Sequence, residues 1–201
     1  MPNNIRAVKA QDIPYLYNIS IKTADGGDDA TDLFNTPLLL GQYFSAPYFQ
    51  YEPQLCSIAL DRNNKPSGYA VGTSNTVLYN SWLNTVWLPP LQEFVKALEP
   101  KSDAEQRVFD HILKGHGQGL WEHSGYPAKL RIDLLPSIRG QGIGRSLVEE
   151  FITKLYEMKI PGVHLRISGH NTNVIKFYEK MGFYLLENTD NSYIMGKKIY
   201  E

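Results

Sequence analysis

A glycine-rich segment in the second half of the chain has the composition of an anion-binding turn. Gly140, Gly142 and Gly144 alternate with other residues directly before an amphipathic stretch. Glycine permits backbone conformations and close approaches that a Cβ would block. The free amides at the start of a helix attract negative charge, and the helix dipole adds to that attraction. The segment therefore predicts a cradle for a phosphate group.

Two common phosphate-binding motifs do not fit this segment. A P-loop requires a lysine and a hydroxyl residue after its last glycine, and no lysine lies between Pro136 and Glu150. A Rossmann fingerprint requires the spacing G-x-G-x-x-G, and counting from Gly140 places Arg145 where the last glycine belongs. The phosphate must belong to another class of ligand.

The segment follows the pattern Arg-x-x-Gly-x-Gly, which begins at Arg139 and is preceded by Leu134-Leu135-Pro136. In this feature the chain resembles the GNAT acetyltransferases, whose acetyl-CoA signature has the same form. The resemblance runs over residues 130–182 and includes Asn171 after the next expected strand. The segment FYEKMGF, residues 177–183, also resembles the closing segment of that family.

The resemblance implies that acetyl-CoA is the cosubstrate and that no metal takes part. Amides around the glycine turn would hold the pyrophosphate, and the backbone at the end of the preceding strand would pair with the pantetheine arm. The residues assigned to the cofactor in this way are Leu134, Leu135, Arg139, Gly140, Gln141, Gly142, Ile143, Gly144, Arg145 and Asn171.

The resemblance also implies direct attack of an amine on the thioester, with Tyr178 protonating the leaving thiolate. Many relatives carry a glutamate early on the strand before the glycine turn, where this chain has Ala128 and Lys129. Asp133 is the nearest carboxylate on that strand and would serve either as the base or as a structural hydrogen-bond partner. A water that relays the proton to Asp133 or to the Asp25/Asp28 segment is the alternative base. This departure leaves two readings open: an N-acetyltransferase, or a catalytically weak or inactive GNAT-fold module for acetyl-CoA binding or interaction.

Carboxylates and aromatic residues in the first half of the chain predict the class of acceptor. Asp25 and Asp28 lie in an acidic segment, residues 23–32, and the aromatic stretch 43–51 follows it. Together with Asp133, these groups would suit a cation through charge pairing and cation–π contact. We therefore expect the acceptor to be a primary amine of a small molecule or a protein.

A narrower likeness lies in the first half of the chain. Residues 23–32, 39–52 and 87–91 are similar to the acetyltransferase-like domain attached to some O-GlcNAcases and to its stand-alone relatives. We expect no sugar hydrolysis, because 201 residues leave no room for a glycosidase domain beside it.

The elements that must position these residues form an α/β pattern. An apolar strand at 128–135 precedes the glycine turn, and apolar residues at steps of three or four predict a helix over 142–158. We expect the GNAT fold, a mixed central sheet flanked by helices. Residues 1–201 would form one domain, with a helical insertion at 77–126 between the third and fourth strands.

Composition narrows the partners. Hydrophobic residues make up 42% of the chain and the net charge is −1, so we expect neither nucleic acid nor membrane as a partner. Cys56 is the single cysteine, which favours a reducing compartment, and the histidine spacing matches no zinc site. Without a signal peptide or an apolar run of membrane-spanning length, we expect a soluble cytoplasmic protein. The oligomeric state stays open.

Overall fold

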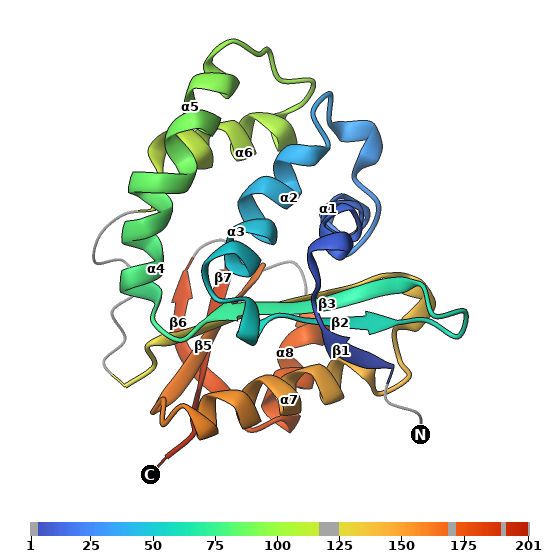
Figure 1. Cartoon of the computed structure of the whole chain (residues 1–201), viewed down its shortest axis with the longest axis vertical. Helices are drawn as coiled ribbons and strands as arrows, with labels where there is room; N and C mark the ends of the chain where they lie inside the picture. The colour runs from blue at the N-terminus through green and yellow to red at the C-terminus, as the bar shows by residue number, and fades with distance from the viewer. Residues whose placement is uncertain (1–3, 117–124, 169–171, 190–191, 201) are drawn as a thin grey trace.

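A mixed sheet forms the centre of the protein. The structure is a computed structural model that describes residues 4–116, 125–168, 172–189 and 192–200. The seven strands have the order β1-β2-β3-β4-β5-β7-β6 (Figure 1), and each neighbouring pair is antiparallel except β4 and β5. The strands are β1 (Ile5–Ala7), β2 (Ser57–Leu60), β3 (Pro66–Thr73), β4 (Ala128–Leu134), β5 (Gly162–Ser168), β6 (Tyr184–Thr189) and β7 (Ser192–Lys198). The predicted fold class is confirmed.

Helices cover both faces of the sheet (Figure 1). The upper face carries α1 (Ile13–Lys22), α2 (Leu38–Phe44), α3 (Ala46–Tyr51), α4 (Thr76–Trp82), α5 (Leu88–Lys96) and α6 (Asp103–Lys114). The lower face carries α7 (Ile143–Glu157) and α8 (Thr172–Lys180). A π-helical turn, Leu83–Trp87, joins α4 to α5.

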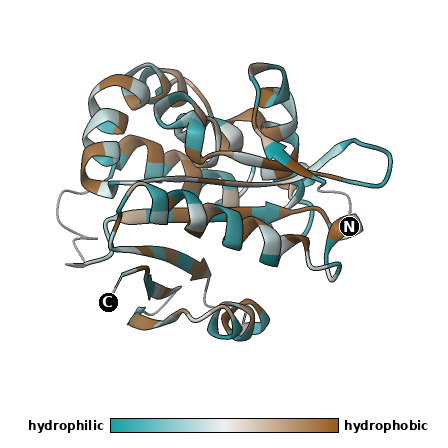
Figure 2. Cartoon of the chain, turned by 60° about the horizontal axis from the view of Figure 1, so that its bottom comes forward, coloured by the Kyte–Doolittle hydropathy of each residue, from teal (hydrophilic) through white to brown (hydrophobic). Residues whose placement is uncertain are grey.

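The alternation of side chains along the strands divides the core into two layers. Ala128 and Leu130 of β4 pack below the sheet with Leu147 and Phe151 of α7, because successive strand residues point to opposite faces. Tyr69 of β3 packs above it with the helices of the upper face. Figure 2 shows the result as hydrophobic and hydrophilic bands along the same helices.

A buried glutamate fastens α6 to the N-terminal half of the chain. Glu105 is fully buried and accepts hydrogen bonds from the backbone amides of Asn35 (3.1 Å), Thr36 (2.8 Å) and Lys101 (2.7 Å), and from the Thr36 hydroxyl. Ser102 caps the helix by accepting from the Glu105 amide at 3.2 Å. The position of α6 above the sheet is therefore set by polar contacts with the segment before α2.

Strands β4 and β5 separate soon after they meet. Their parallel ladder consists of the pairs Ala128↔Val163 and Lys129↔His164, although β4 continues for five residues and β5 for four residues beyond them. On its other side β4 stays paired with β3 as far as Gly68↔Leu134. The backbone of β4 from residue 130 onward therefore has one edge that β5 does not use.

Within the described ranges, none of the helices has the length and apolar character needed to cross a membrane.

Candidate functional site

The glycine turn lies between β4 and α7 and depends on two left-handed residues. Gly140 has φ +72° and Gly142 has φ +80°, a region that other residues adopt only with strain. A Cβ built on either glycine would meet no heavy atom within 4 Å in the described structure. The surface above the turn is therefore open, and the backbone is accessible to a ligand.

The start of α7 presents its amides to this open surface. Gly142 is the residue before the helix and has no side chain that could cap it, and the first helical bond runs from the Ser146 amide to the Gly142 carbonyl. The amides of Ile143, Gly144 and Arg145 lie before this first bond, so they have no acceptor carbonyl within the helix. The site is suited to an anion.

Close packing fixes the turn against the sheet and α8. A Cβ on Gly144 would lie 3.3 Å from Leu134 Cδ1 and 3.6 Å from Phe177 Cζ, so this position has little room for a side chain. Gln141 and Arg145 are exposed. Gln141 Nε2 donates to the Ser137 carbonyl at 2.8 Å, which closes the turn on itself.

Arg139 connects the glycine turn to the acidic segment between α1 and α2. Its Nε donates to the Leu134 carbonyl at 2.9 Å, its Nη2 donates to the Gly27 carbonyl, and its Nη1 lies 4.0 Å from Asp28 Oδ1. Asp25 and Asp28 exchange backbone hydrogen bonds of 3.0 and 2.8 Å. Asp28, one of the carboxylates predicted for the acceptor, therefore lies beside Arg139, the first residue of the predicted pyrophosphate motif.

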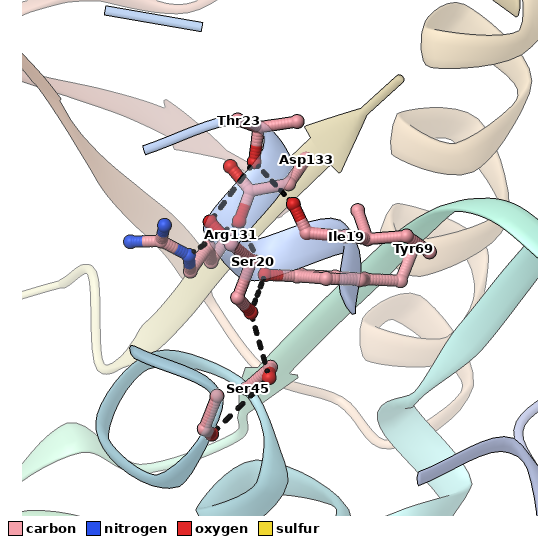
Figure 3. A network of polar contacts seen from close by, with 8 residues as sticks. Ile19, Ser20, Thr23, Ser45, Tyr69, Arg131 and Asp133 are labelled. Atoms are coloured by element: carbon pink, nitrogen blue, oxygen red, sulfur yellow. Dashed lines mark hydrogen bonds and ion pairs between the residues drawn. The ribbon is translucent and has the colours of Figure 1, made fainter. Parts of the chain in front are cut away.

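Asp133 lies in a polar network on the upper face of the sheet (Figure 3). Its Oδ2 accepts hydrogen bonds from the Tyr69 hydroxyl and from Arg131 Nε, the latter at 2.8 Å. The Tyr69 hydroxyl is also within 2.9 Å of Ser20 Oγ, which is 3.0 Å from Ser45 Oγ. The aspartate in the otherwise apolar strand thus has partners for its charge.

Arg131 is held from two sides. Its Nε binds Asp133, and its guanidinium carbon lies 4.4 Å from the centre of the Phe44 ring. Burial by itself lowers the pKa of Arg131, but Asp133 and Tyr69 outweigh burial, so the net effect raises that pKa. In Figure 3 the two terminal guanidinium nitrogens point away from the network.

Tyr178 lies on α8 with its ring buried. The ring contacts Phe177 and Phe183 at centroid distances of 5.0 and 5.3 Å, both edge-to-face. Burial raises the pKa of the Tyr178 phenol, and the charge of Asp133 raises it further. The phenol is therefore protonated at neutral pH. Among the described residues its hydroxyl has no hydrogen-bond partner.

Comparison with known proteins agrees with this geometry. Residues 104–185 match the family model described as the acetyltransferase (GNAT) domain. The solved structure named SsHAT superposes with a TM-score of 0.86 at 29% identity, over 98% of both chains. Residues 104–185 thus match the GNAT acetyltransferase domain, and the chain as a whole has the GNAT fold.

Two further proteins illustrate the range of GNAT relatives. A peptidyl-lysine N-acetyltransferase, YjaB, of Salmonella typhimurium is 44% identical over 48 residues, which are 24% of this chain and 30% of that protein. The chain thus matches less than a third of the length of this curated relative. A phosphinothricin acetyltransferase of Sinorhizobium meliloti, in complex with AcCoA, has the same fold, with a TM-score of 0.61 at 17% identity over 100% of this chain and 90% of that one.

The fold brings the cofactor residues on and around the glycine turn together. Asp133 lies in the network on the upper face of the sheet and Tyr178 in the core below it, and the charge of Asp133 raises the pKa of the Tyr178 phenol. No hydrogen bond joins Asp25 or Asp28 to Asp133 among the residues that the structure describes. Asn171 lies outside the described residues, and no group of metal-ligating side chains occurs within them.

Arg131, Tyr69 and Ser20 are site residues that the sequence did not single out. One sequence feature could have indicated Arg131. Charged residues occupy every second position of an otherwise apolar strand, at Lys129, Arg131 and Asp133. Such alternation places the three side chains on one face of the GNAT sheet. Tyr69 and Ser20 carry no comparable signal, because their partners are far away in the sequence.

Proposed function

We propose that this chain is an acetyl-CoA-dependent N-acetyltransferase that moves the acetyl group to a primary amine by direct attack. The observation that carries the proposal is the open glycine turn at the start of α7, where two left-handed glycines leave the backbone amides accessible. The GNAT domain match supports the same conclusion.

The residues of the turn suit the diphosphate of acetyl-CoA. A Cβ at Gly140 or Gly142 would occupy the space that a bound phosphate needs, and α7 has no side-chain cap competing for its amides. Arg139 and Arg145 add positive charge beside the turn. The edge of β4 that β5 leaves unpaired would receive the pantetheine arm near Leu134 and Leu135, as an added strand would. Asn171 is retained as a further cofactor residue.

The protein's own contribution to the reaction is to orient two reactants and to move two protons. Acetyl-CoA, when bound, supplies the acetyl group as a thioester. Tyr178 holds a proton on its hydroxyl, because burial keeps its phenol neutral, and we assign that proton to the leaving sulfur. Burial weakens the phenol as an acid, but the same apolar surroundings also disfavour a thiolate, so the transfer stays possible.

The amine must lose a proton, and Asp133 is the carboxylate that we assign to receive it. Its Oδ2 is engaged with Tyr69 and Arg131, whereas its Oδ1 accepts no hydrogen bond from the described residues. The side chain is 15% exposed, so Oδ1 can be reached by the amine or by a relaying water. Asp133 would thus accept the proton on Oδ1, while the hydrogen bonds to Oδ2 hold the side chain in position.

The acceptor class in this proposal is a primary amine, as in the relative named for acting on peptidyl-lysine. Asp25 and Asp28 remain candidates for binding it, although they lie beside Arg139. The narrower relationship with the acetyltransferase-like domain attached to some O-GlcNAcases also stays a proposal, which rests on the sequence of residues 23–32, 39–52 and 87–91.

Calorimetry with a glycine variant tests the cofactor assignment. We expect acetyl-CoA to bind in the micromolar range, about −8 kcal/mol, and Gly142→Glu to abolish binding by placing bulk and negative charge over the turn. Gly142→Ala is the matched control, because it shares the strain of a positive φ but adds no charge. If a folded Gly142→Glu protein keeps its affinity, the assignment is wrong.

Release of free thiol in the presence of amines separates the enzyme from a binding module. An N-acetyltransferase releases coenzyme A only when an acceptor amine is present. Binding of acetyl-CoA without amine-dependent thiol release across a broad panel of amines would instead support the weak or inactive module.

A further inference from the structure

The upper face of β4 carries more positive than negative charge. Lys129, Arg131 and Asp133 share this face because they alternate along the strand. Asp133 forms an ion pair with Arg131, so its negative charge neutralises one of the two positive charges. Lys129 makes no hydrogen bond or ion pair with the described residues. One positive charge is therefore left over at the place where β4 and β5 separate.

Arg131 has donors to spare. The ion pair with Asp133 uses Nε, and Phe44 covers the guanidinium at 4.4 Å. The Tyr69 side chain also stabilises the charged form of Arg131. The side chain is 30% exposed, and both nitrogens point away from the network (Figure 3). Two parallel N–H groups in this arrangement match the two oxygens of a carboxylate.

The walls around this charge are aromatic and neutral. Tyr43 of α2 stacks on His116 at 5.4 Å and on His111 at 6.3 Å between ring centres. Burial lowers the pKa of His116 to about 3, and burial also lowers the pKa of His111, with Arg166 of β5 acting in the same direction. Both imidazoles are therefore mainly uncharged at neutral pH.

Arg166 lies on the same face of the sheet as Arg131. His164 is the register partner of Lys129, and Arg166 and Arg131 each follow two residues later on their strands. Arg166 Nε already donates to Ser192 Oγ at 2.8 Å, so Arg166 is engaged and is not needed as a direct ligand.

From this arrangement we infer that the acceptor of the proposed N-acetyltransferase carries a carboxylate besides its amine, and that Arg131 binds this carboxylate with support from Lys129. The acetyl transfer in this inference rests on the proposed function, whereas the carboxylate rests on the charged side chains on the upper face of β4. On β4, Arg131 is paired with Asp133 and Lys129 supplies one further positive charge, which matches a carboxylate better than a doubly charged phosphate. The expected substrates are amino acids or peptides in which a free carboxylate lies near the acetylated amine.

Matched pairs of ligands test the inference by binding. Glycine, β-alanine, alanine, phenylalanine and lysine are each compared with the corresponding carboxamide by calorimetry, on protein saturated with coenzyme A. In at least one pair we expect the free acid to bind about 10- to 100-fold more tightly, as charge-assisted hydrogen bonds require. Equal affinities within every pair, or tighter binding of aminomethylphosphonate than of glycine, would overturn the inference.

Two variants identify the groups responsible. Arg131→Lys keeps a positive charge beside Asp133 but loses the two parallel N–H groups of the guanidinium. We expect this variant to lose most of the preference for the free acid, while the carboxamide binds as before. Lys129→Gln removes the surplus charge without touching Asp133 and should reduce the preference about threefold or more. Arg62→Gln, in an exposed turn, is the control and should change nothing. An unchanged preference in Arg131→Lys contradicts the inference even if Lys129→Gln has an effect.

Turnover separates this inference from the proposed function. If the acids bind selectively but no member of the panel releases thiol from acetyl-CoA, the carboxylate site stands and the proposed activity fails. If amines with and without a carboxylate are acetylated equally well and bound equally well, the activity stands and the carboxylate site is wrong.

Discussion

The two carboxyl oxygens of Asp133 have different surroundings, and this difference organises the candidate site at the scale of single residues. Oδ2 accepts from Tyr69 and Arg131, while Oδ1 has no partner among the described residues. A carboxylate bound through one oxygen is oriented without being blocked. The same contact orients Arg131, so replacement of Asp133 would disturb both proton transfer and the side chain that we assign to the acceptor.

Tyr178→Phe tests proton donation at this scale. Because the phenol is buried and neutral, the variant should keep its packing against Phe177 and Phe183 and lose only the hydroxyl. We expect turnover to fall about 100-fold while the affinity for acetyl-CoA, measured by calorimetry, changes little.

The exposed Tyr156 provides a control, since Tyr156→Phe lies on the far part of α7 and should have wild-type turnover. Full turnover in Tyr178→Phe would make Tyr178 a packing residue. Lost affinity for acetyl-CoA in that variant would give it a binding role.

At the scale of elements, the parts of the fold with strong local signals could be predicted. The apolar strand predicted before the glycine turn and the helix predicted after it agree with β4 and α7 to within one residue at each end. Helix α3 was not expected, because its six residues carry a proline and aromatic side chains and are helical mainly through their packing. The network around Asp133 could not be predicted either, since it joins residues from α1, β3 and β4 that only the sheet register brings together.

The attachment of α6 through Glu105 is an element-scale feature with a measurable cost. Glu105→Gln replaces one accepting oxygen by a donor opposite the partly buried amides of Asn35 and Lys101, which leaves these two donors without an acceptor. We expect the free energy of unfolding to fall by about 2–3 kcal/mol, measured by urea denaturation. Glu93→Gln is the control, because Glu93 is exposed and pairs with Lys96 only, and it should change stability by less than about 0.5 kcal/mol.

The pH dependence of the Glu105 contribution follows from its pKa. Burial raises the pKa of Glu105, but hydrogen bonds from Thr36, Lys101 and Asn35 outweigh burial and leave the pKa below its ordinary value. A carboxyl with a lowered pKa contributes stability above its unfolded-state pKa, about 4.3, and loses it as pH falls through the folded-state value. The stability difference between wild type and Glu105→Gln should therefore be constant down to about pH 4 and shrink below it. A difference that grows on acidification would contradict this account.

At the scale of the whole molecule, the sheet separates two layers with separate cores. The lower layer, with α7 and α8, carries the glycine turn and Tyr178, and the upper layer carries the aromatic and charged residues that we assign to the acceptor. The two reactants would therefore approach from opposite sides of the sheet and meet where β4 and β5 separate.

Binding of acetyl-CoA should stabilise the whole domain by mass action. At a concentration of about 100 times the dissociation constant, the gain is about 2.7 kcal/mol, which corresponds to a rise in Tm of roughly 5–10 °C for a domain of this size. Thermal unfolding followed by circular dichroism measures this shift. Adenosine, which lacks the diphosphate, should give no shift, and Gly142→Glu should lose it. A shift of equal size in that variant would show that the glycine turn is not the binding site.

The hydrogen bond from Arg139 to the Gly27 carbonyl joins residues that are 112 positions apart in the chain. A contact of such long range forms only after the intervening chain has collapsed, because the entropy of closing the loop must be met first. The glycine turn has a local sequence signature, yet its tie to the acidic segment is among the most non-local contacts of the domain. We therefore expect competence to bind a diphosphate in the final geometry to be acquired late in folding, after the N-terminal helices have packed on the sheet.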